Sequence, residues 1–337
     1  MKVFMIGSTG LLGSAAAEEL IERGHQVISI ALPPLPEGAK FPKQLQIEFG
    51  NYLEMDDDKL RSYLKGCDGF VFAAGVDERV EGPYPIYDMY KKYNIDPVER
   101  LLKLAKECGV RHAVICGSYF SYFAKTKPNM KLVENHPYIR SRIDQEEVAL
   151  FFADDDFSVA VLELPYIFGV QKGRKPVWMF LAEQIKSNDF ATFYPSGGST
   201  MVTVRQVAQA ICGALVNTRG GKCWPIGWDN LSWNELLKIA HEALGYKDRR
   251  IINVPKWMFN LGVRSILKKQ KENGIDGGLN LKKLGDIQYS YFYIDKALGS
   301  EPLGVEEDDI KAAITASFEL CKEIMDGKSK AIGMKGE

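Results

Sequence analysis

The sequence predicts an α/β fold built on a doubly wound parallel sheet, followed by a smaller and less regular region. Two observations favour this fold class. Short apolar runs alternate with helical patterns from Val3 to Leu164, and the regular alternation ends at Pro165. Strands that are connected through helices lie parallel in one sheet, and the helices then cover both of its faces.

The elements of the first half alternate between strand and helix. Their strand segments are apolar almost throughout, which is typical of strands buried on both faces. We predict strands at residues 3–6, 27–32, 45–49, 69–74, 113–116 and 158–164. We predict helices at residues 14–23, 56–65, 93–108 and 138–152.

The second half is richer in tryptophan, glycine and proline. Helices are predicted there at residues 178–187, 204–216, 233–245 and 308–323. We therefore expect a first domain over residues 1–165 and a smaller region over 166–327 that is interleaved with late strands of the sheet. Residues 328–337, rich in lysine and glycine, are expected to form a flexible tail.

Two acidic triplets have the composition of metal ligands but not the context. Asp56 to Asp58 opens a predicted helix, and Asp154 to Asp156 stands in a predicted turn, so capping and solvation explain both. The four histidines are scattered along the chain. We predict no metal site.

Composition and charge point to a small-molecule partner. Lysine and arginine (43) nearly balance aspartate and glutamate (44), so no overall field attracts nucleic acid or an anionic membrane. The six cysteines include no C-x-x-C pair and predict reduced thiols. With no secretory leader pattern and no apolar run of about 18 residues, we expect a cytoplasmic protein without a membrane segment.

A glycine-rich turn directly follows the first predicted strand and leads into the first predicted helix. This is the context in which such a turn binds the diphosphate of a dinucleotide, through backbone N–H groups at the helix N-terminus. Residues 1–165 are therefore predicted to be a dinucleotide-binding domain of the Rossmann type. The turn consists of Gly7, Ser8, Thr9, Gly10, Leu11, Leu12 and Gly13.

The choice between NAD and NADP depends on the end of the second strand. An acid there would bind the ribose hydroxyls and repel a 2′-phosphate, but Ala31 occupies the position. No arginine stands beside it to attract the phosphate. Lys40 and Lys43 follow downstream, and Glu37 is a possible ribose ligand. Both cofactors remain open, with a slight preference for NADP.

Further motifs resemble the extended short-chain dehydrogenase/reductase family, also called the NAD-dependent epimerase/dehydratase family, over about residues 1–240. Gly50-Asn51 is similar to the family's Gly-Asp pair, and Pro137-Tyr138-Ile139-Arg140-Ser141-Arg142 resembles its Pro-Tyr-x-x-Ser-Lys motif. Ser118 ends the fifth strand, as in that family. The resemblance implies that cofactor contacts also come from Asn51, Tyr52, Ala73, Ala74, Gly75, Asn94 and Pro165.

Oxidoreductase chemistry explains these residue types. Moving a hydride to or from a carbinol carbon requires an acid/base at its oxygen, and the resemblance implies that Tyr138 has this role. A phenol needs a nearby cation to ionise near neutral pH, and Arg142 lies one helical turn later on the same face. Ser118 would donate a hydrogen bond to the substrate oxygen.

Arg142 departs from the family pattern, which has lysine. A guanidinium keeps the charge but does not fill the contacts of an ammonium, so catalysis is retained, weakened or lost. Tyr138 and Arg142 would otherwise be a helix-start aromatic residue and a surface cation. The sequence predicts catalysis by Tyr138.

The substrate segments lack the marks of nucleotide-sugar epimerases. Those enzymes commonly carry an asparagine where Pro165-Tyr166 stands here, and an Arg-Asp-Tyr motif where residues 200–204 stand. The segments are closer to the branch that resembles dihydroflavonol reductases and 3β-hydroxysteroid dehydrogenases. Aromatic walls suit an apolar ligand. The predicted substrate-binding residues are Tyr84, Tyr119, Phe168 and Trp178.

The sequence thus predicts an NAD(P)-dependent oxidoreductase that acts on a hydroxyl or carbonyl group of a partly apolar small molecule. The alternatives are a nucleotide-sugar epimerase or dehydratase, and a non-catalytic NAD(P)-binding sensor. A homodimer formed through the helices at 93–108 and 138–152 is a further possibility that the resemblance raises.

Overall fold

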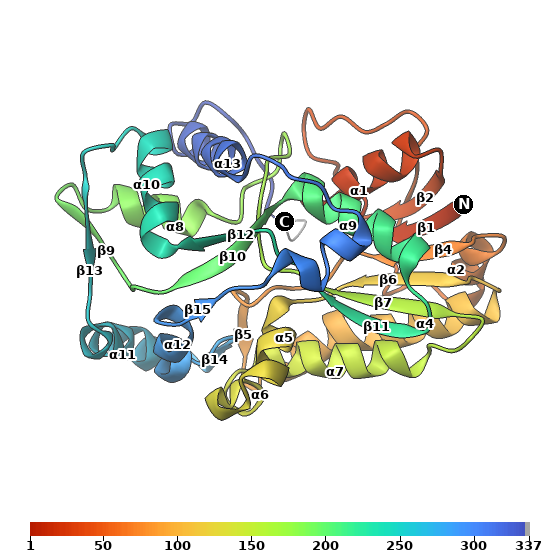
Figure 1. The fold of residues 1–337 in the computed structure, drawn as a ribbon, viewed down its shortest axis with the longest axis horizontal. Coiled ribbons are helices and arrows are strands. Elements are labelled where there is room, and N and C mark those ends of the chain that lie inside the picture. Colours follow the sequence, from red (N-terminus) through yellow and green to blue (C-terminus); the bar gives the residue numbers. More distant parts are fainter. Residues whose placement is uncertain (334–337) are drawn as a thin grey trace.

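The computed structural model describes residues 1–333 and is organised around one central sheet (Figure 1). Seven strands run parallel in the order β11-β7-β6-β4-β1-β2-β3, which confirms the predicted doubly wound α/β fold. The strands are β1 (Lys2–Ile6), β2 (Gln26–Ala31), β3 (Gln46–Phe49), β4 (Gly69–Phe72), β6 (His112–Cys116), β7 (Ser158–Glu163) and β11 (Gly221–Pro225).

Helices cover both faces of this sheet because successive side chains of a strand point to opposite faces. Val3 and Met5 of β1 contact α1 (Leu11–Glu22) and α9 (Val204–Asn217) on one face. Phe4 and Ile6 face the opposite core. That core is closed by α2 (Asp57–Leu64), α4 (Asp96–Glu107) and α7 (Pro137–Phe151). The apolar strand pattern of the sequence therefore reflects a sheet buried on both sides.

The helix predicted at 93–108 is longer and less regular than expected. It consists of α3 (Tyr87–Tyr90), a π-helical turn over Lys91–Ile95, and α4. Pro97 stands in the first turn of α4, where its missing N–H costs no hydrogen bond. The wide turn contains the buried Asn94, which matters for the site described below.

The second half forms a mixed four-stranded sheet and its own core, drawn on the left of Figure 1. The strands are β8 (Tyr166–Phe168), β10 (Gly198–Thr203), β12 (Asp229–Ser232) and β15 (Tyr291–Phe292). Beside them, β9 (Ala191–Tyr194) pairs with β13 (Arg250–Asn253). The predicted helices appear as α8 (Met179–Lys186), α9, α10 (Trp233–Leu244) and α13 (Ile310–Met325).

Several elements were not predicted. Among them are the seventh strand of the central sheet, β11, the strands of the second half, and β5 (Glu81–Pro83), α5 (Tyr119–Thr126), α6 (Leu132–Asn135), α11 (Lys256–Glu272), β14 (Ile275–Gly277) and α12 (Leu281–Gln288). In α11 only Val263 is buried, whereas Trp257 is 62% exposed. Because the apolar residues of α11 lie on several sides of the helix, they leave no clear helical period in the sequence.

The first acidic triplet caps a helix and the second stabilises a turn, as predicted. Asp56 accepts a hydrogen bond from the backbone N–H of Lys59 at 2.7 Å, at the start of α2. Asp154 accepts hydrogen bonds from the N–H groups of Asp156 and Phe157.

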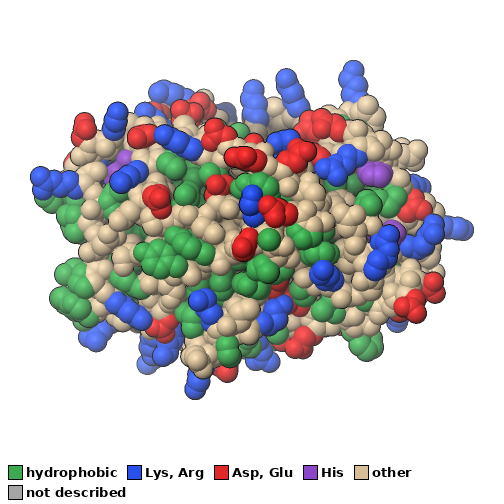
Figure 2. Space-filling model, in the orientation of Figure 1, with side chains coloured by type: hydrophobic (Ala, Val, Ile, Leu, Met, Phe, Trp, Pro, Cys, Tyr) green, Lys and Arg blue, Asp and Glu red, His purple; other side chains and the backbone are tan. Residues whose placement is uncertain are grey.

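The segment predicted as a flexible tail makes ordered contacts as far as the structure describes it. The N–H of Ile332 donates to the carbonyl of Gly173 at 2.9 Å, and the N–H of Lys175 donates to the carbonyl of Ile332 at 2.9 Å. Residues 334–337 of that segment lie outside the described residues. No helix in residues 1–333 has the length and apolar character needed to cross a membrane. Figure 2 shows charged side chains of both signs around the whole outline.

Candidate active site

The glycine-rich turn between β1 and α1 depends on close backbone contacts. Gly7 has a φ of 96°, which disfavours any residue with a side chain. A β-carbon at Gly7 would lie 2.4 Å from the carbonyl oxygen of Ala73, and one at Gly13 would lie 2.1 Å from the carbonyl oxygen of Gly7. The N–H of Gly10 donates to the Gly7 carbonyl at 3.0 Å and tightens the turn.

The turn fits the diphosphate of a dinucleotide. Gly10 precedes α1 without a side-chain cap, so the first N–H groups of the helix have no side-chain partner there. A β-carbon at Gly10 would meet only the Gly7 carbonyl oxygen, at 3.4 Å. The Ser8 hydroxyl is buried and has no hydrogen-bond partner among residues 1–333. Free N–H groups at a helix N-terminus are the donors that bind phosphate.

The predicted small residues after β4 lie across from this turn. β1 and β4 are neighbours at the point where the strand order reverses, and ligands bind there at the carboxyl ends of the strands. Ala73 and Ala74 follow β4, and a β-carbon at Gly75 would lie 2.5 Å from Oδ1 of Asn94. Asn94 accepts from the N–H of Val76 at 2.8 Å and donates to its carbonyl at 3.0 Å. The Asn94 side chain thus fixes the backbone of this strand end.

The remaining predicted cofactor residues lie at the ends of β3 and β7. Asn51 follows β3, and its Oδ1 accepts from the N–H of Leu53 at 3.1 Å. Tyr52 packs edge-on against Phe72, and burial raises the pKa of its hydroxyl to about 12. Pro165 is buried directly after β7.

The three predicted catalytic residues meet at the ends of β6 and α7. Ser118 follows β6 and caps α5, Tyr138 lies in the first turn of α7, and Arg142 lies one turn later. The Arg142 guanidinium carbon is 5.0 Å from the centre of the Tyr138 ring. All three side chains are at most 6% exposed. The structure therefore brings Ser118 and Arg142 together, although 24 positions separate them in the sequence.

Burial and the neighbouring groups shift the pKa of Tyr138 in opposite directions. Burial raises the pKa of its hydroxyl, because the phenolate is poorly solvated there. The positive charge of Arg142 lowers this pKa, and a contact with Ser118 lowers it further. Arg142 and Ser118 are thus placed to favour the ionised form that an acid/base requires.

Arg142 is held by a network that also involves Asn94. It donates to Oε1 of Gln145 at 2.9 Å and to the carbonyl of Val76 at 3.2 Å. Gln145 in turn donates to the carbonyl of Asn94 at 2.6 Å. Sequence reasoning missed Gln145, although its spacing of seven from Tyr138 gives it the same helix face. The network connects α7 to the end of β4.

Glu78 is a second residue that sequence reasoning missed. It follows Gly75 by three positions, and burial raises the pKa of its carboxyl, with a further increase from Asp77. Arg79 and Arg142 lower that pKa. Glu78 in turn raises the pKa of Tyr138, so a negative charge at Glu78 opposes ionisation of the tyrosine. Only its position in the loop after β4 signalled a role.

The four predicted substrate-binding aromatics do not form one surface. Tyr119 is buried and its hydroxyl lies 3.0 Å from Oγ of Ser199. Trp178 is 6% exposed and stacks on Phe168 with 4.2 Å between ring centres. Phe168 has no exposed surface and packs in the core of the second half, and its contact with a substrate stays a prediction. Tyr84 is 78% exposed on the surface.

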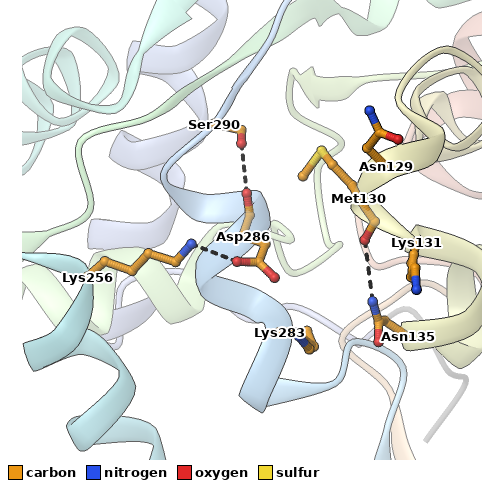
Figure 3. A pocket seen from close by; sticks show the side chains of 8 residues that line it. All are labelled: Asn129, Met130, Lys131, Asn135, Lys256, Lys283, Asp286 and Ser290. Atoms are coloured by element: carbon orange, nitrogen blue, oxygen red, sulfur yellow. Dashed lines mark hydrogen bonds and ion pairs between the residues drawn. The ribbon is translucent and has the colours of Figure 1, made fainter.

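A separate hollow of about 400 Å³ opens between α6 and α12 (Figure 3). Lys256 forms an ion pair with Asp286 at 2.6 Å inside it. Its lining includes none of the three predicted catalytic residues. Within residues 1–333 there is also no group of three or more His, Cys, Asp or Glu side chains that could hold a metal ion. This hollow is thus separate from the predicted catalytic residues.

Solved structures resemble the chain over almost its whole length. The structure of gox2253 has a TM-score of 0.72 at 18% identity and covers 97% of this chain and 99% of its own. MoeE5 in complex with UDP-glucose and NAD has a TM-score of 0.64 at 18% identity, with 96% and 100% covered. UDP-glucuronic acid 4-epimerase from Bacillus cereus in complex with NAD has a TM-score of 0.67 at 13% identity, with 96% and 99% covered. These likenesses establish the shared fold.

No curated protein sequence matches the chain. The model of one protein family does, over residues 3–227. The match includes the glycine-rich turn, the Ser118 and Tyr138 positions and most of the network around Arg142. The chain therefore belongs to the NAD dependent epimerase/dehydratase family.

Proposed function

We propose that this protein is an NAD(P)-dependent oxidoreductase that acts on a hydroxyl or carbonyl group of a partly apolar small molecule. The observation that carries the proposal is the placement of Tyr138 between Ser118 and Arg142, at the carboxyl ends of parallel strands. A buried tyrosine next to a permanent cation and a hydroxyl donor is suited to proton transfer at a carbinol oxygen.

Each residue has a distinct part in this reaction. The nicotinamide ring, when bound, supplies or accepts the hydride. Tyr138 donates a proton to the carbonyl oxygen during reduction and removes it during oxidation. Ser118 donates a hydrogen bond to the same oxygen and stabilises the charge that develops on it. Arg142 lowers the pKa of Tyr138 and stays charged at all relevant pH values.

An aromatic wall around Tyr166, which reaches Tyr119 in the same apolar core as Tyr138, supports an apolar substrate. Tyr166 stands where nucleotide-sugar epimerases commonly carry an asparagine, and its ring lies 5.3 Å from Trp178 and 5.6 Å from Trp233 between centres. Such rings offer apolar contact area and few hydrogen bonds. The rival function is a nucleotide-sugar epimerase, which the names of MoeE5 and the Bacillus cereus enzyme favour. A third candidate is a cofactor sensor without catalysis.

NADP is proposed to bind at least as well as NAD. Ala31 at the end of β2 is 5% exposed and carries no charge, so nothing at that position repels a 2′-phosphate. Calorimetric titration of both dinucleotides tests this. An NAD preference above about tenfold, or about 1.4 kcal/mol, would contradict it.

A carbonyl-compound screen followed by the Tyr138→Phe variant tests the reaction. We expect turnover to fall by roughly 10²- to 10⁴-fold, while cofactor binding changes little, because only the acid/base is lost. Tyr90→Phe is the matched control, since that buried ring lies 5.4 Å from Tyr138 but its hydroxyl bonds only to the carbonyls of Asp77 and Val80.

Three outcomes decide between the candidate functions. Full activity in Tyr138→Phe would remove the proposed mechanism. Interconversion of UDP-sugars by the wild type, without net reduction of a carbonyl compound, would favour the epimerase. Cofactor binding with no activity in either assay would favour the sensor.

A further inference from the structure

A segment of the second half crosses back over the glycine-rich turn. We call residues 169–177, which connect β8 to α8, the strap. Gln171 Nε2 donates to the carbonyl of Thr9 at 3.1 Å and to Oγ of Ser14 at 3.2 Å. Arg174 donates to the same Thr9 carbonyl at 3.2 Å. The strap therefore lies against the turn that is proposed to hold the diphosphate.

The strap also touches the connection that follows β2. A β-carbon at Gly173 would lie 2.3 Å from the carbonyl oxygen of Glu37, and one at Gly38 would lie 3.0 Å from Cε of Lys172. The turn after β1 and the end of β2 are the two elements that flank the adenosine ribose in a dinucleotide-binding fold. The strap is thus the segment of the second half that bridges both sides of the ribose position.

Arg174 brings a positive charge to this place without a matching negative one. Its guanidinium donates to three neutral oxygens: Oε1 of Gln171 at 3.2 Å and the carbonyls of Gly333 at 3.1 Å and Thr9. Within residues 1–333 no carboxylate lies within ion-pair distance of it. Burial lowers the pKa of Arg174, as expected for a partly desolvated cation without a counter-ion. An anion beside it would remove this imbalance.

We propose that Arg174 binds the 2′-phosphate of NADP, and that Lys172 adds a second positive charge on the same side. The inference rests on the proposed cofactor site and deepens it. In many NADP-binding folds an arginine near the end of β2 has this role. Here residues 31–36 contain no arginine or lysine, so the charge comes from a segment more than a hundred residues later in the chain. The planar guanidinium group of Arg174 can donate two parallel hydrogen bonds to a phosphate.

Calorimetry with two fragments isolates the 2′-phosphate. Adenosine 2′,5′-bisphosphate and AMP differ by that group alone, and neither requires a substrate or turnover. We expect the wild type to bind the bisphosphate more tightly than AMP. In Arg174→Met the affinity for the bisphosphate should fall by roughly 10- to 100-fold, the loss expected for a hydrogen-bonded charge, while AMP binding is nearly unchanged.

Matched variants keep the test specific. Lys175 is exposed on the same strap, so Lys175→Met removes an equal charge and should leave both affinities unchanged. If Arg174→Met does not fold, Arg174→Lys replaces it, and we expect a smaller loss in the same direction because an ammonium cannot reproduce the planar fork.

The proposal is overturned by any of three results. The wild type binds both fragments equally, or Arg174→Met weakens both to the same extent, or the loss appears in Lys40→Met or Lys43→Met instead. If AMP and ADP fail to bind the wild type at all, the dinucleotide site of the proposed function fails as well. Weak bisphosphate binding with intact ADP binding would remove only the role of Arg174.

Discussion

The two halves of the molecule build their parts of the site in different ways. In the first half, the wall proposed to hold the cofactor consists of short runs of consecutive residues at strand ends: Gly7 to Gly13 after β1 and Ala73 to Gly75 after β4. In the second half, the aromatic wall consists of rings from separate segments. Tyr166 of β8 contacts Trp178 before α8 and Trp233 at the start of α10.

This difference shows which features carry each wall. Backbone atoms form the first, so steric tolerance at a few glycines decides whether it exists. Side-chain packing forms the second, so it depends on long-range contacts that also hold the core of that half together. Substitutions should therefore act differently in the two halves, and the predictions below test that comparison in order of expected size.

Phe168→Ala tests whether the rings of the second half are core residues. Phe168 is fully buried and stacked on Trp178, so we expect a loss of about 3–5 kcal/mol in the free energy of unfolding, typical of truncating a buried aromatic side chain. Denaturant titration measures it. Tyr84→Ala, at a side chain that is 78% exposed, is the control and should change stability by less than about 0.5 kcal/mol. A small loss in Phe168→Ala would contradict the division into backbone and ring walls.

A charge cluster at the end of β7, with two buried glutamates, should respond to pH. Lys125 Nζ lies 2.7 Å from Glu146 Oε2 and 2.8 Å from Glu163 Oε1, at the end of β7. Burial raises the pKa of Glu163 from 4.5 to about 7, with a further increase from Glu146. The folded protein thus keeps a proton that the unfolded chain releases, so this stabilisation is complete below about pH 4.5 and is lost as the pH rises through about 7.

Glu163→Gln removes that proton equilibrium. Between pH 4.5 and 7 we expect the wild type to lose up to about 3 kcal/mol of unfolding free energy relative to the variant. Denaturant titrations at both ends of this range measure the difference. Glu147→Gln, at an exposed position of α7, is the control and should follow the wild type. Parallel curves of unfolding free energy against pH for wild type and Glu163→Gln would show that Glu163 does not titrate in this range.

Gly13→Ala tests the backbone wall of the first half. The added β-carbon would lie 2.1 Å from the Gly7 carbonyl oxygen, and because that atom is backbone, relief requires the turn to move. We expect a loss of about 1–3 kcal/mol in unfolding free energy. Gly10→Ala should stay within about 0.5 kcal/mol, since its nearest contact is 3.4 Å and its φ is −81°. Equal effects at the two glycines would contradict the steric argument.

Arg142→Lys tests the role of Arg142 in the proposed active site. The Arg142 guanidinium donates hydrogen bonds to both Gln145 and the carbonyl of Val76. A compact ammonium cannot make both bonds, so we expect the lysine to be free to contact the cofactor ribose. We expect cofactor affinity to rise by up to about tenfold, or about 1.4 kcal/mol, and the pH profile of turnover to move to lower pH. Arg140→Lys, on the exposed side of α7, is the control. A silent Arg142→Lys would make that arginine a structural residue only.

The sequence alone determined six of the seven strands of the central sheet, the glycine turn and the placement of Tyr138, Arg142 and Ser118. These features follow from local patterns: apolar runs mark buried strands, glycines mark backbone contact, and a spacing of four puts Tyr138 and Arg142 on one helix face. In a parallel sheet the carboxyl ends of all strands lie at the same edge, so residues that follow different strands come together there.

Only the tertiary structure decided which aromatic residues face the site and which distant residues serve it. Phe168 and Tyr84 are both aromatic, yet one has no exposed surface and the other is 78% exposed, because burial depends on what packs against a ring and not on the ring itself. In the same way, a spacing of seven from Tyr138 and a place in the loop after β4 are the only local signals for Gln145 and Glu78, and Arg174 has none. Their roles arise from contacts between segments far apart in the chain, and such contacts exist only once the chain has folded.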